Sequence, residues 1–154
     1  MPPLPIDVVF QPVAVPAVSH AKPVKLIEIK DQRSEKDSIG NLGEHIVYGH
    51  KVMPWLKSYL KASLTPDCQF QGPLSVIVHL NKLYIDMDDN NIISAIVVKT
   101  QYYQKSKLVA VKVFRGQGGS MHWFDSPSEI RDTLNKAMQA VLDQNRQFIC
   151  RRFA

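Results

Sequence analysis

Histidines and clustered acidic side chains are the residues with which this chain would perform metal chemistry. His45 and His50 have no supporting carboxylate or thiolate at a spacing typical of zinc sites, and the other histidines are isolated. The run Asp86–Asn91 resembles a calcium loop only in composition, because positions six and twelve are asparagine and valine instead of glycine and glutamate. We interpret this run as a hairpin tip and predict no metal site.

Motifs for nucleophilic catalysis or phosphate binding are also missing from the sequence. The run Gly116–Ser120 departs from a dinucleotide-binding fingerprint, since the third glycine would fall at Met121, and no Gly-Lys-Ser/Thr follows it. We expect a flexible connection there. No G-x-S-x-G occurs, and neither cysteine stands beside a histidine in the sequence. The sequence therefore predicts no catalytic residue and no cofactor, and a protein that is not an enzyme.

The chain has two cysteines, Cys68 and Cys150. Their number excludes a zinc ribbon and a scaffold of several disulfides. Cys68 falls in the polar turn Thr65–Cys68, and we expect Cys150 to follow the last helix. A single intramolecular disulfide would matter only in an oxidising compartment, and two separate thiols are the alternative that we favour.

Two helices are predicted from apolar residues at helical spacing. In Lys51–Leu64 these residues form one stripe, and Pro54 falls in the first turn, where a missing N–H costs nothing. The second helix is expected at about 127–147, because the run Ser126–Glu129 supplies an N-cap, a proline at N1 and a capping-box glutamate.

Alternating apolar residues predict strands at Val24–Lys30, Leu74–Met87, Ile92–Gln104 and Lys107–Arg115. Short links join the last three as antiparallel neighbours, and a change of phase near Asn81-Lys82 predicts a β-bulge. A loop or small hairpin is expected between the first strand and the first helix. The predicted fold class is α+β, an antiparallel sheet of about four strands with two helices on one face, in the order β-α-β-β-β-α.

Proline is concentrated at the start of the chain, where six of the ten prolines lie in the first 23 residues. This spacing predicts an extended arm over 1–23, with an edge strand at Ile6–Phe10. Residues 24–154 are then expected to form a single domain, as the length of 154 residues suggests. The chain as given contains no signal-peptide pattern and no apolar run long enough to span a bilayer.

The net charge is 19 − 14 = +5. This balance permits contact with nucleic acid, anionic lipid or an acidic partner, without selecting among them. The helix, three-strand, helix order also occurs in double-stranded-RNA-binding domains, which grip phosphates with lysines at the start of their second helix. Here that position carries two acids and one base, Glu129, Asp132 and Arg131, so no specific nucleic acid is expected.

Six residues are candidates for binding a partner, namely Asp31, Arg33, Trp123, Phe124, Arg151 and Arg152. For Asp31 and Arg33, at a strand end, we favour a structural role in which charge-assisted hydrogen bonds hold the following loop. For Trp123 and Phe124 we favour a hydrophobic staple or a core position over an interface anchor. The C-terminal arginines are interpreted as a solvated basic tail, with a polyanion site as the alternative.

The strand ending in Asp31-Gln32-Arg33, the Leu83-Tyr84-Ile85-Asp86 segment, the long hairpins and the Ser/Pro-capped last helix resemble the YajG-type lipoproteins of Gram-negative bacteria. The resemblance covers about Ile6 to Phe148. It implies a domain on the periplasmic side of the cell envelope, anchored in the outer membrane through a lipid in the native precursor, with the anchor absent from this chain. It carries over no catalytic residue, and the molecular role of the family is undefined.

We therefore expect a non-enzymatic envelope domain that binds a protein or another envelope component through a sheet edge, the arm or the Trp123-Phe124 region. The expected partner is an envelope protein or a second copy of the chain. The alternative is a module that binds a small molecule or a polyanion, nucleic acid or anionic lipid, through Arg33 and the C-terminal arginines.

Overall fold

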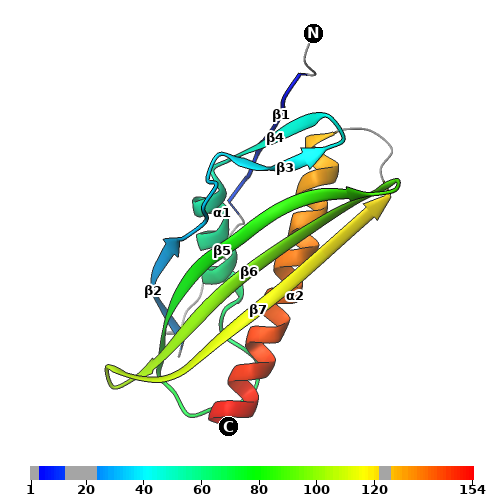
Figure 1. Cartoon of the computed structure of the whole chain (residues 1–154). Helices are drawn as coiled ribbons and strands as arrows, with labels where there is room; N and C mark the ends of the chain where they lie inside the picture. Colours follow the sequence, from blue (N-terminus) through cyan, green and yellow to red (C-terminus); the bar gives the residue numbers. More distant parts are fainter. Residues whose placement is uncertain (1–3, 13–23, 122–125) are drawn as a thin grey trace.

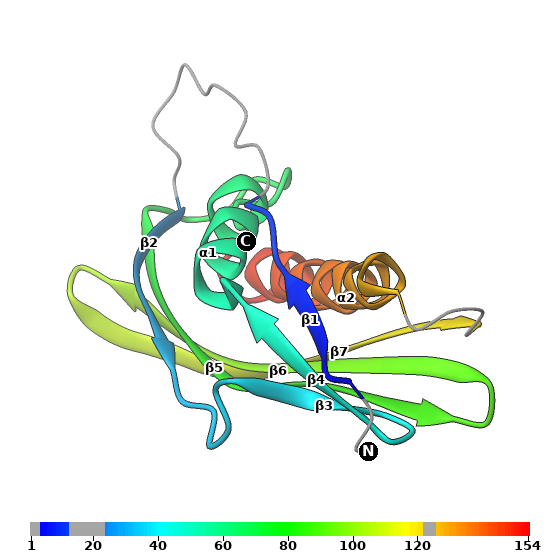
Figure 2. The same ribbon diagram turned by 90° about the horizontal axis from the view of Figure 1, so that it is seen from above.

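The computed structural model describes residues 4–12, 24–121 and 126–154. In these ranges seven strands form one mixed sheet, and two helices cover one of its faces (Figures 1 and 2). The elements in chain order are β1 (Ile6–Val9), β2 (Val24–Asp31), β3 (Ser38–Leu42), β4 (His45–His50), α1 (Val52–Ser63), β5 (Leu74–Asp88), β6 (Asn91–Gln104), β7 (Lys107–Met121) and α2 (Pro127–Phe153).

The antiparallel meander predicted from the sequence is confirmed as β5, β6 and β7. The predicted bulge is also present, because the register of β5 against β6 shifts between Leu80 and Lys82. Both hairpin turns use residues with positive φ, Asp89 in the first and Lys105 with Ser106 in the second. Two consecutive residues of this kind suit the tight turn whose twist matches that of paired strands.

The prediction of about four antiparallel strands is wrong, since the sheet has seven strands and is mixed. Strand β1 pairs parallel to β4, and β2 pairs parallel to the first half of β5, Leu74–Leu80. Beyond the bulge, β5 meets a different neighbour, because Gly40 of β3 pairs with Ile85. The bulge thus lets one side of β5 hold two strands in succession.

Residues 6–10 contribute to the sheet and to the core. The edge strand expected at Ile6–Phe10 is present as β1, and Ile6, Val8 and Phe10 are buried. The Phe10 ring lies 4.9 Å, centroid to centroid, from the ring of Trp55 on α1. This strand therefore packs with the elements that follow residue 24.

Both predicted helices are confirmed, although α2 is longer than expected. The hydroxyl of Ser126 caps α2 by accepting a hydrogen bond from the Glu129 amide at 3.2 Å. The helix continues past 147 to Phe153 because Ile149 and Phe153 extend its buried stripe. Cys150 consequently lies inside the helix. The expectation that it follows the helix is wrong.

The glycine run expected as a flexible connection is part of β7 and packs against α2. A Cβ at Gly116 would collide with the carbonyl oxygen of Ala137, and one at Gly118 with that of Thr133. These two glycines therefore allow the backbones of strand and helix to approach closely.

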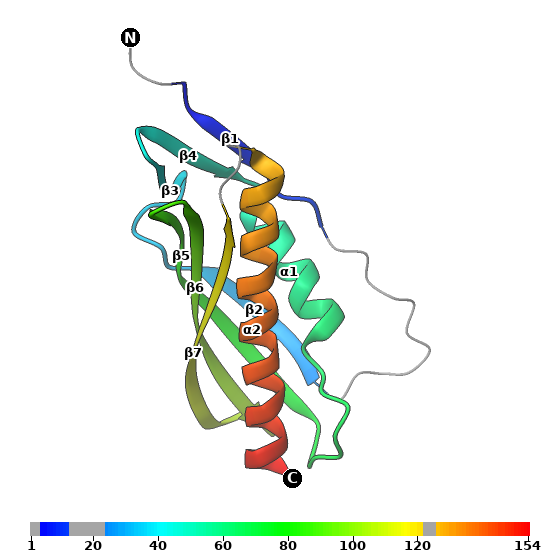
Figure 3. The ribbon, with the colours of Figure 1, turned by 90° about the vertical axis from the view of Figure 1, so that its right-hand side faces the viewer.

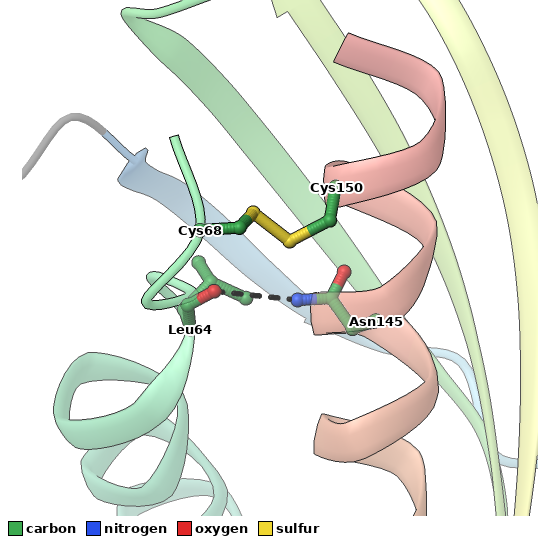
Figure 4. Close-up of a disulfide and its surroundings, with 4 residues drawn as sticks. All are labelled: Leu64, Cys68, Asn145 and Cys150. Carbon is green, nitrogen blue, oxygen red and sulfur yellow. Dashed lines mark hydrogen bonds between the residues drawn. A yellow bond between two sulfur atoms is a disulfide. The ribbon is translucent and has the colours of Figure 1, made fainter. Parts of the chain in front are cut away.

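Cys68 and Cys150 form a disulfide, so the preference for two separate thiols is wrong (Figure 4). The bond joins the loop after α1 to the last turns of α2, with 6.1 Å between the two Cα atoms. Next to it, the side-chain amide of Asn145 donates a hydrogen bond to the Leu64 carbonyl at 3.5 Å. Folding brings together two cysteines that are 82 residues apart in the chain.

Tyr102 is fully buried and its hydroxyl donates a hydrogen bond to the Asn145 side chain. Burial raises the pKa of Tyr102 far above its ordinary value of 10.0, and burial also raises the pKa of Tyr59. Above pH 10 an unfolded chain releases the tyrosine proton while the folded protein retains it, so the folded state binds more protons and loses stability as pH rises.

We expect the free energy of unfolding to fall above pH 10 by up to about 1.4 kcal/mol per pH unit for Tyr102. The Tyr102→Phe variant should start from a lower stability at neutral pH and show a shallower alkaline slope. Urea unfolding at a series of pH values from 7 to 11 measures both. Equal slopes for the two proteins would contradict the assignment.

Candidate functional site: the open edge of strand β2

Side chains of α2 occupy the free edges of β7 and β1. Along β7, Lys136, Gln144 and Arg152 donate hydrogen bonds to the carbonyls of Gly119 at 3.2 Å, Arg115 at 2.7 Å and Val109 at 3.4 Å. On β1, the carbonyl of Val9 accepts a hydrogen bond from Arg131 at 3.3 Å. Such contacts use acceptors that a strand of another chain would need, and they protect an edge from unwanted pairing.

The edge of β2 borders a groove instead. Beside it lies α1, which Figure 3 shows next to β2 on the helical side of the sheet. The groove has a volume of about 670 Å³ and is lined by Leu26, Ile27, Glu28 and Ile29 of β2 and by Met53, Pro54, Lys57 and Lys61 of α1. Because β2 pairs with β5 on one side, alternate residues direct backbone N–H and C=O groups toward the other side.

Local sequence features explain the shape of this groove. The register of β2 shifts between Leu26 and Glu28, and this irregularity leaves Ile27 53% exposed at the edge. Leu26, Ile29 and Met53 are partly buried against the core. Lys57 is exposed on the rim. The groove therefore combines an apolar floor, a rim that carries Lys57 and Glu28, and an edge of β2 that pairs with no other strand of the described ranges.

The structure brings together Asp31 and Arg33, two of the residues proposed from the sequence. The Arg33 guanidinium donates to both carboxylate oxygens of Asp31, at 2.9 and 2.8 Å, and the side chain of Arg33 is only 5% exposed. The hydrogen bond from Arg33 lowers the pKa of Asp31, and burial opposes this effect. The pair stands at the end of β2, where the Gln32 amide donates to the Leu80 carbonyl. These charge-assisted hydrogen bonds hold the end of β2 and the start of the following loop in place.

A smaller cavity of about 300 Å³ adjoins this pair, with Arg33, Ser38, Asn81, Lys82 and Tyr84 among its lining residues. Within the described ranges, Nη1 of Arg33 is buried and has no hydrogen-bond partner. A role of Asp31 and Arg33 in partner binding stays a prediction.

The remaining candidates lie elsewhere. Trp123 and Phe124 fall outside the described residues. Arg151 and Arg152 occupy the last turn of α2, with the guanidinium of Arg152 5.3 Å from the Phe153 ring centre. The C-terminus of α2 lies at the opposite end of the molecule from β3, which follows Arg33 in the chain (Figure 1). The structure does not join Arg33 and the C-terminal arginines in one polyanion site.

Sequence reasoning missed the groove. One signal was present, since Met53, Lys57 and Lys61 follow each other at intervals of four and so form a second stripe on α1. The residues that this stripe faces are set by the parallel pairing of β2 with β5, which local patterns do not reveal.

The described ranges carry neither a metal-binding cluster nor a helix suited to a bilayer. No three histidine, cysteine or acidic side chains there lie close enough to share a metal ion. Neither helix there has the length and apolar character needed to cross a bilayer.

No known family model matches the chain, and no curated protein sequence does. Among solved structures, it is similar to protein XCC0632 from Xanthomonas campestris, of the DUF330 family model, at 14% identity, covering 97% of this chain and 93% of that chain, with a TM-score of 0.49. The hypothetical protein CT253 from Chlamydia trachomatis is 9% identical over 84% of this chain and 98% of that chain, with a TM-score of 0.45. Lipoprotein GNA1162 from Neisseria meningitidis is 7% identical over 79% of this chain and 95% of that chain, with a TM-score of 0.35. None of these three is described as YajG-type, so that resemblance stays a prediction.

Proposed function

We propose that this protein is a binding module that takes up an extended protein segment at the edge of β2. The observation that carries the proposal is the groove of about 670 Å³ between this edge and α1, beside backbone groups that a further strand would use. In binding of this kind, main-chain hydrogen bonds supply affinity and pockets for alternate side chains supply specificity. The edges of β7 and β1 suit such a role less well because α2 side chains occupy their carbonyls.

The lining of the groove defines the chemistry of the segment. Leu26, Ile29 and Met53 offer an apolar floor, so every second residue of the segment should be aliphatic. Lys57 on the rim favours an acidic residue at a position that points outward from the floor. The activity that we propose is binding without catalysis. The bound segment belongs to an envelope protein or to a second copy of this chain.

We further propose that the protein works in an oxidising compartment. The Cys68–Cys150 disulfide supports this, because structural disulfides persist in secreted and periplasmic proteins. Together with the resemblance to YajG-type lipoproteins, this favours the periplasmic side of a Gram-negative envelope, with a lipid anchor in the native precursor. Sequencing the gene upstream of this chain tests the point, since a signal peptide ending in a lipobox cysteine is expected there.

Strand addition is tested with a short acetylated peptide in which valine alternates with threonine and one threonine is replaced by glutamate. We expect the peptide to shift amide NMR signals of β2 and α1 in the full chain. The Lys57→Glu variant should bind it about tenfold more weakly, because reversing a rim charge replaces an attraction by a repulsion of similar size. Lys105→Glu, in the β6–β7 turn and outside the lining of the groove, changes the net charge equally and should leave the affinity unchanged.

A pair of methylated peptides distinguishes strand addition from other uses of the groove. The same peptide is N-methylated at one or the other set of alternate residues, and the set whose N–H groups face β2 cannot form the edge ladder, so that peptide should not bind. Equal binding of the unmethylated peptide and both methylated peptides would refute strand addition and indicate that side-chain contacts in the groove carry the binding.

A further inference from the structure

Three lysines and one arginine, Lys30, Lys82, Lys99 and Arg115, come together on the sheet face that the helices leave uncovered. Strand register places Lys30, His79, Lys99 and Val113 in one row across β2, β5, β6 and β7. The next row, beyond the bulge in β5, contains Lys82, Val97 and Arg115. We call these two rows the cationic rows.

The alternation along each strand fixes the side on which the cationic rows lie. Leu80, Val98 and Phe114 are buried in the core under the helices, so the residues next to them in the strands point to the other face. Beyond the bulge in β5 the buried residue is Leu83, so its neighbour Lys82 points to that other face as well. Figure 2 shows both helices on the opposite side of the sheet. Lys30, Lys82 and Arg115 are exposed, and Lys99 is partly exposed.

No acidic side chain balances the charge within these rows. None of the four cations forms an ion pair with another residue of the described ranges. On this face of these strands the nearest acids are Glu28, which pairs with Ile77 in the row before, and Asp86, which stands two rows beyond Lys82. Asp31, next to Lys30, pairs with the buried Leu80 and forms an ion pair with Arg33. From strand spacing and rise, the four cations occupy an area of about 14 Å by 7 Å, since they span three strand spacings and two residues. Such a cluster attracts anions at the surface.

Aliphatic side chains adjoin the cations on the same face. Val111 and Val113 of β7 are 46% and 44% exposed, and Val113 stands in the row of Lys99. The sheet curves around the helices, so this outer face is convex (Figure 2). A convex face offers no enclosed site for a small anion, and it presents cations and aliphatic groups together to a broad surface.

We propose that the cationic rows form a docking surface for a membrane that contains anionic phospholipid. The lysines and arginine would pair with lipid phosphates while Val111 and Val113 enter the headgroup region. Charge complementarity selects an anionic surface, and the exposed valines favour lipid over nucleic acid, because a nucleic acid backbone offers valine no apolar partner. This surface lies on the opposite face of the sheet from the groove between β2 and α1, and its function does not depend on strand addition.

The test is binding of the full chain to vesicles of phosphatidylglycerol and phosphatidylcholine in equal parts, measured by co-sedimentation. We expect binding that weakens as salt rises and that is lost with pure phosphatidylcholine. Lys82→Gln with Arg115→Gln should reduce partition into the mixed vesicles about 30-fold, from about fivefold for each charge. Lys105→Gln with Lys107→Gln lowers the net charge by the same two units, from +5 to +3, and should have little effect.

Three outcomes would overturn the proposal. One is equal binding to pure phosphatidylcholine, and another is an equal loss in both double variants, which would show that only net charge matters. The third is binding of a DNA or RNA duplex at lower protein concentration than the vesicles, with the same dependence on Lys82 and Arg115. Lys57→Glu should leave vesicle binding unchanged, so failure of strand addition and failure of membrane docking are separable.

Discussion

Replacing Cys68 and Cys150 by serine is expected to lower the free energy of unfolding by about 4–5 kcal/mol. The disulfide closes a loop between residues that are 82 apart in the chain, and a loop of this length removes much conformational entropy from the unfolded state. A loss of this size is a large part of the stability of a typical domain. Urea unfolding followed by the fluorescence of Trp55, which is buried, measures the change.

The reduced wild-type protein is the matched control for this variant. A thiol reductant should lower the stability of the wild type to about that of the double serine variant, and it should leave the variant itself unaffected. A difference below about 1 kcal/mol between oxidised and reduced wild type would show that the closed loop contributes little.

The second large effect is expected in β7, where Gly116→Ala and Gly118→Ala should each destabilise the protein by about 3 kcal/mol. The added Cβ would meet the carbonyl oxygen of Ala137 or of Thr133 in α2. A backbone carbonyl within a helix cannot rotate away as a side chain does, so α2 itself must move from the sheet. The displacement would loosen the packing of the buried residues along α2, including Leu134, Met138 and Val141.

Gly119 in the same strand supplies the control. The atom nearest to a Cβ built there is the Ile92 carbonyl oxygen at 3.8 Å, which is ordinary contact. We expect Gly119→Ala to change the free energy of unfolding by less than about 1 kcal/mol. The change is an increase if the lower conformational entropy of the unfolded chain is the larger effect. Equal effects at all three glycines would contradict a role in helix packing and indicate a general cost of replacing glycine.

The two proposed binding surfaces share strand β2 but use its opposite faces. Leu26 and Ile29 point into the groove beside α1, and Lys30 belongs to the cationic rows on the outer face. An extended segment added at the edge of β2 would therefore leave the outer face of the sheet free. The arrangement is compatible with one protein that holds a peptide segment while its outer face contacts a membrane.

The sequence by itself determined the local elements of this protein. Ser126, Pro127 and Glu129 marked the start of α2, and the spacing in 51–64 identified α1. Alternation and short turns identified β5, β6 and β7, and the change of phase at Asn81 located the bulge. These features depend on residues close together in the chain, whose backbone preferences and periodicity act over a few positions.

The tertiary structure alone decided the parallel pairings of β1 and β2, the approach of α2 to Gly116 and Gly118, and the union of Cys68 with Cys150. It also decided that the edge of β2 faces a groove and that Lys30, Lys82, Lys99 and Arg115 share one face. The physical reason is that these contacts join segments tens of residues apart. Their selection depends on how all the apolar faces are buried together, and no short stretch of sequence carries that information.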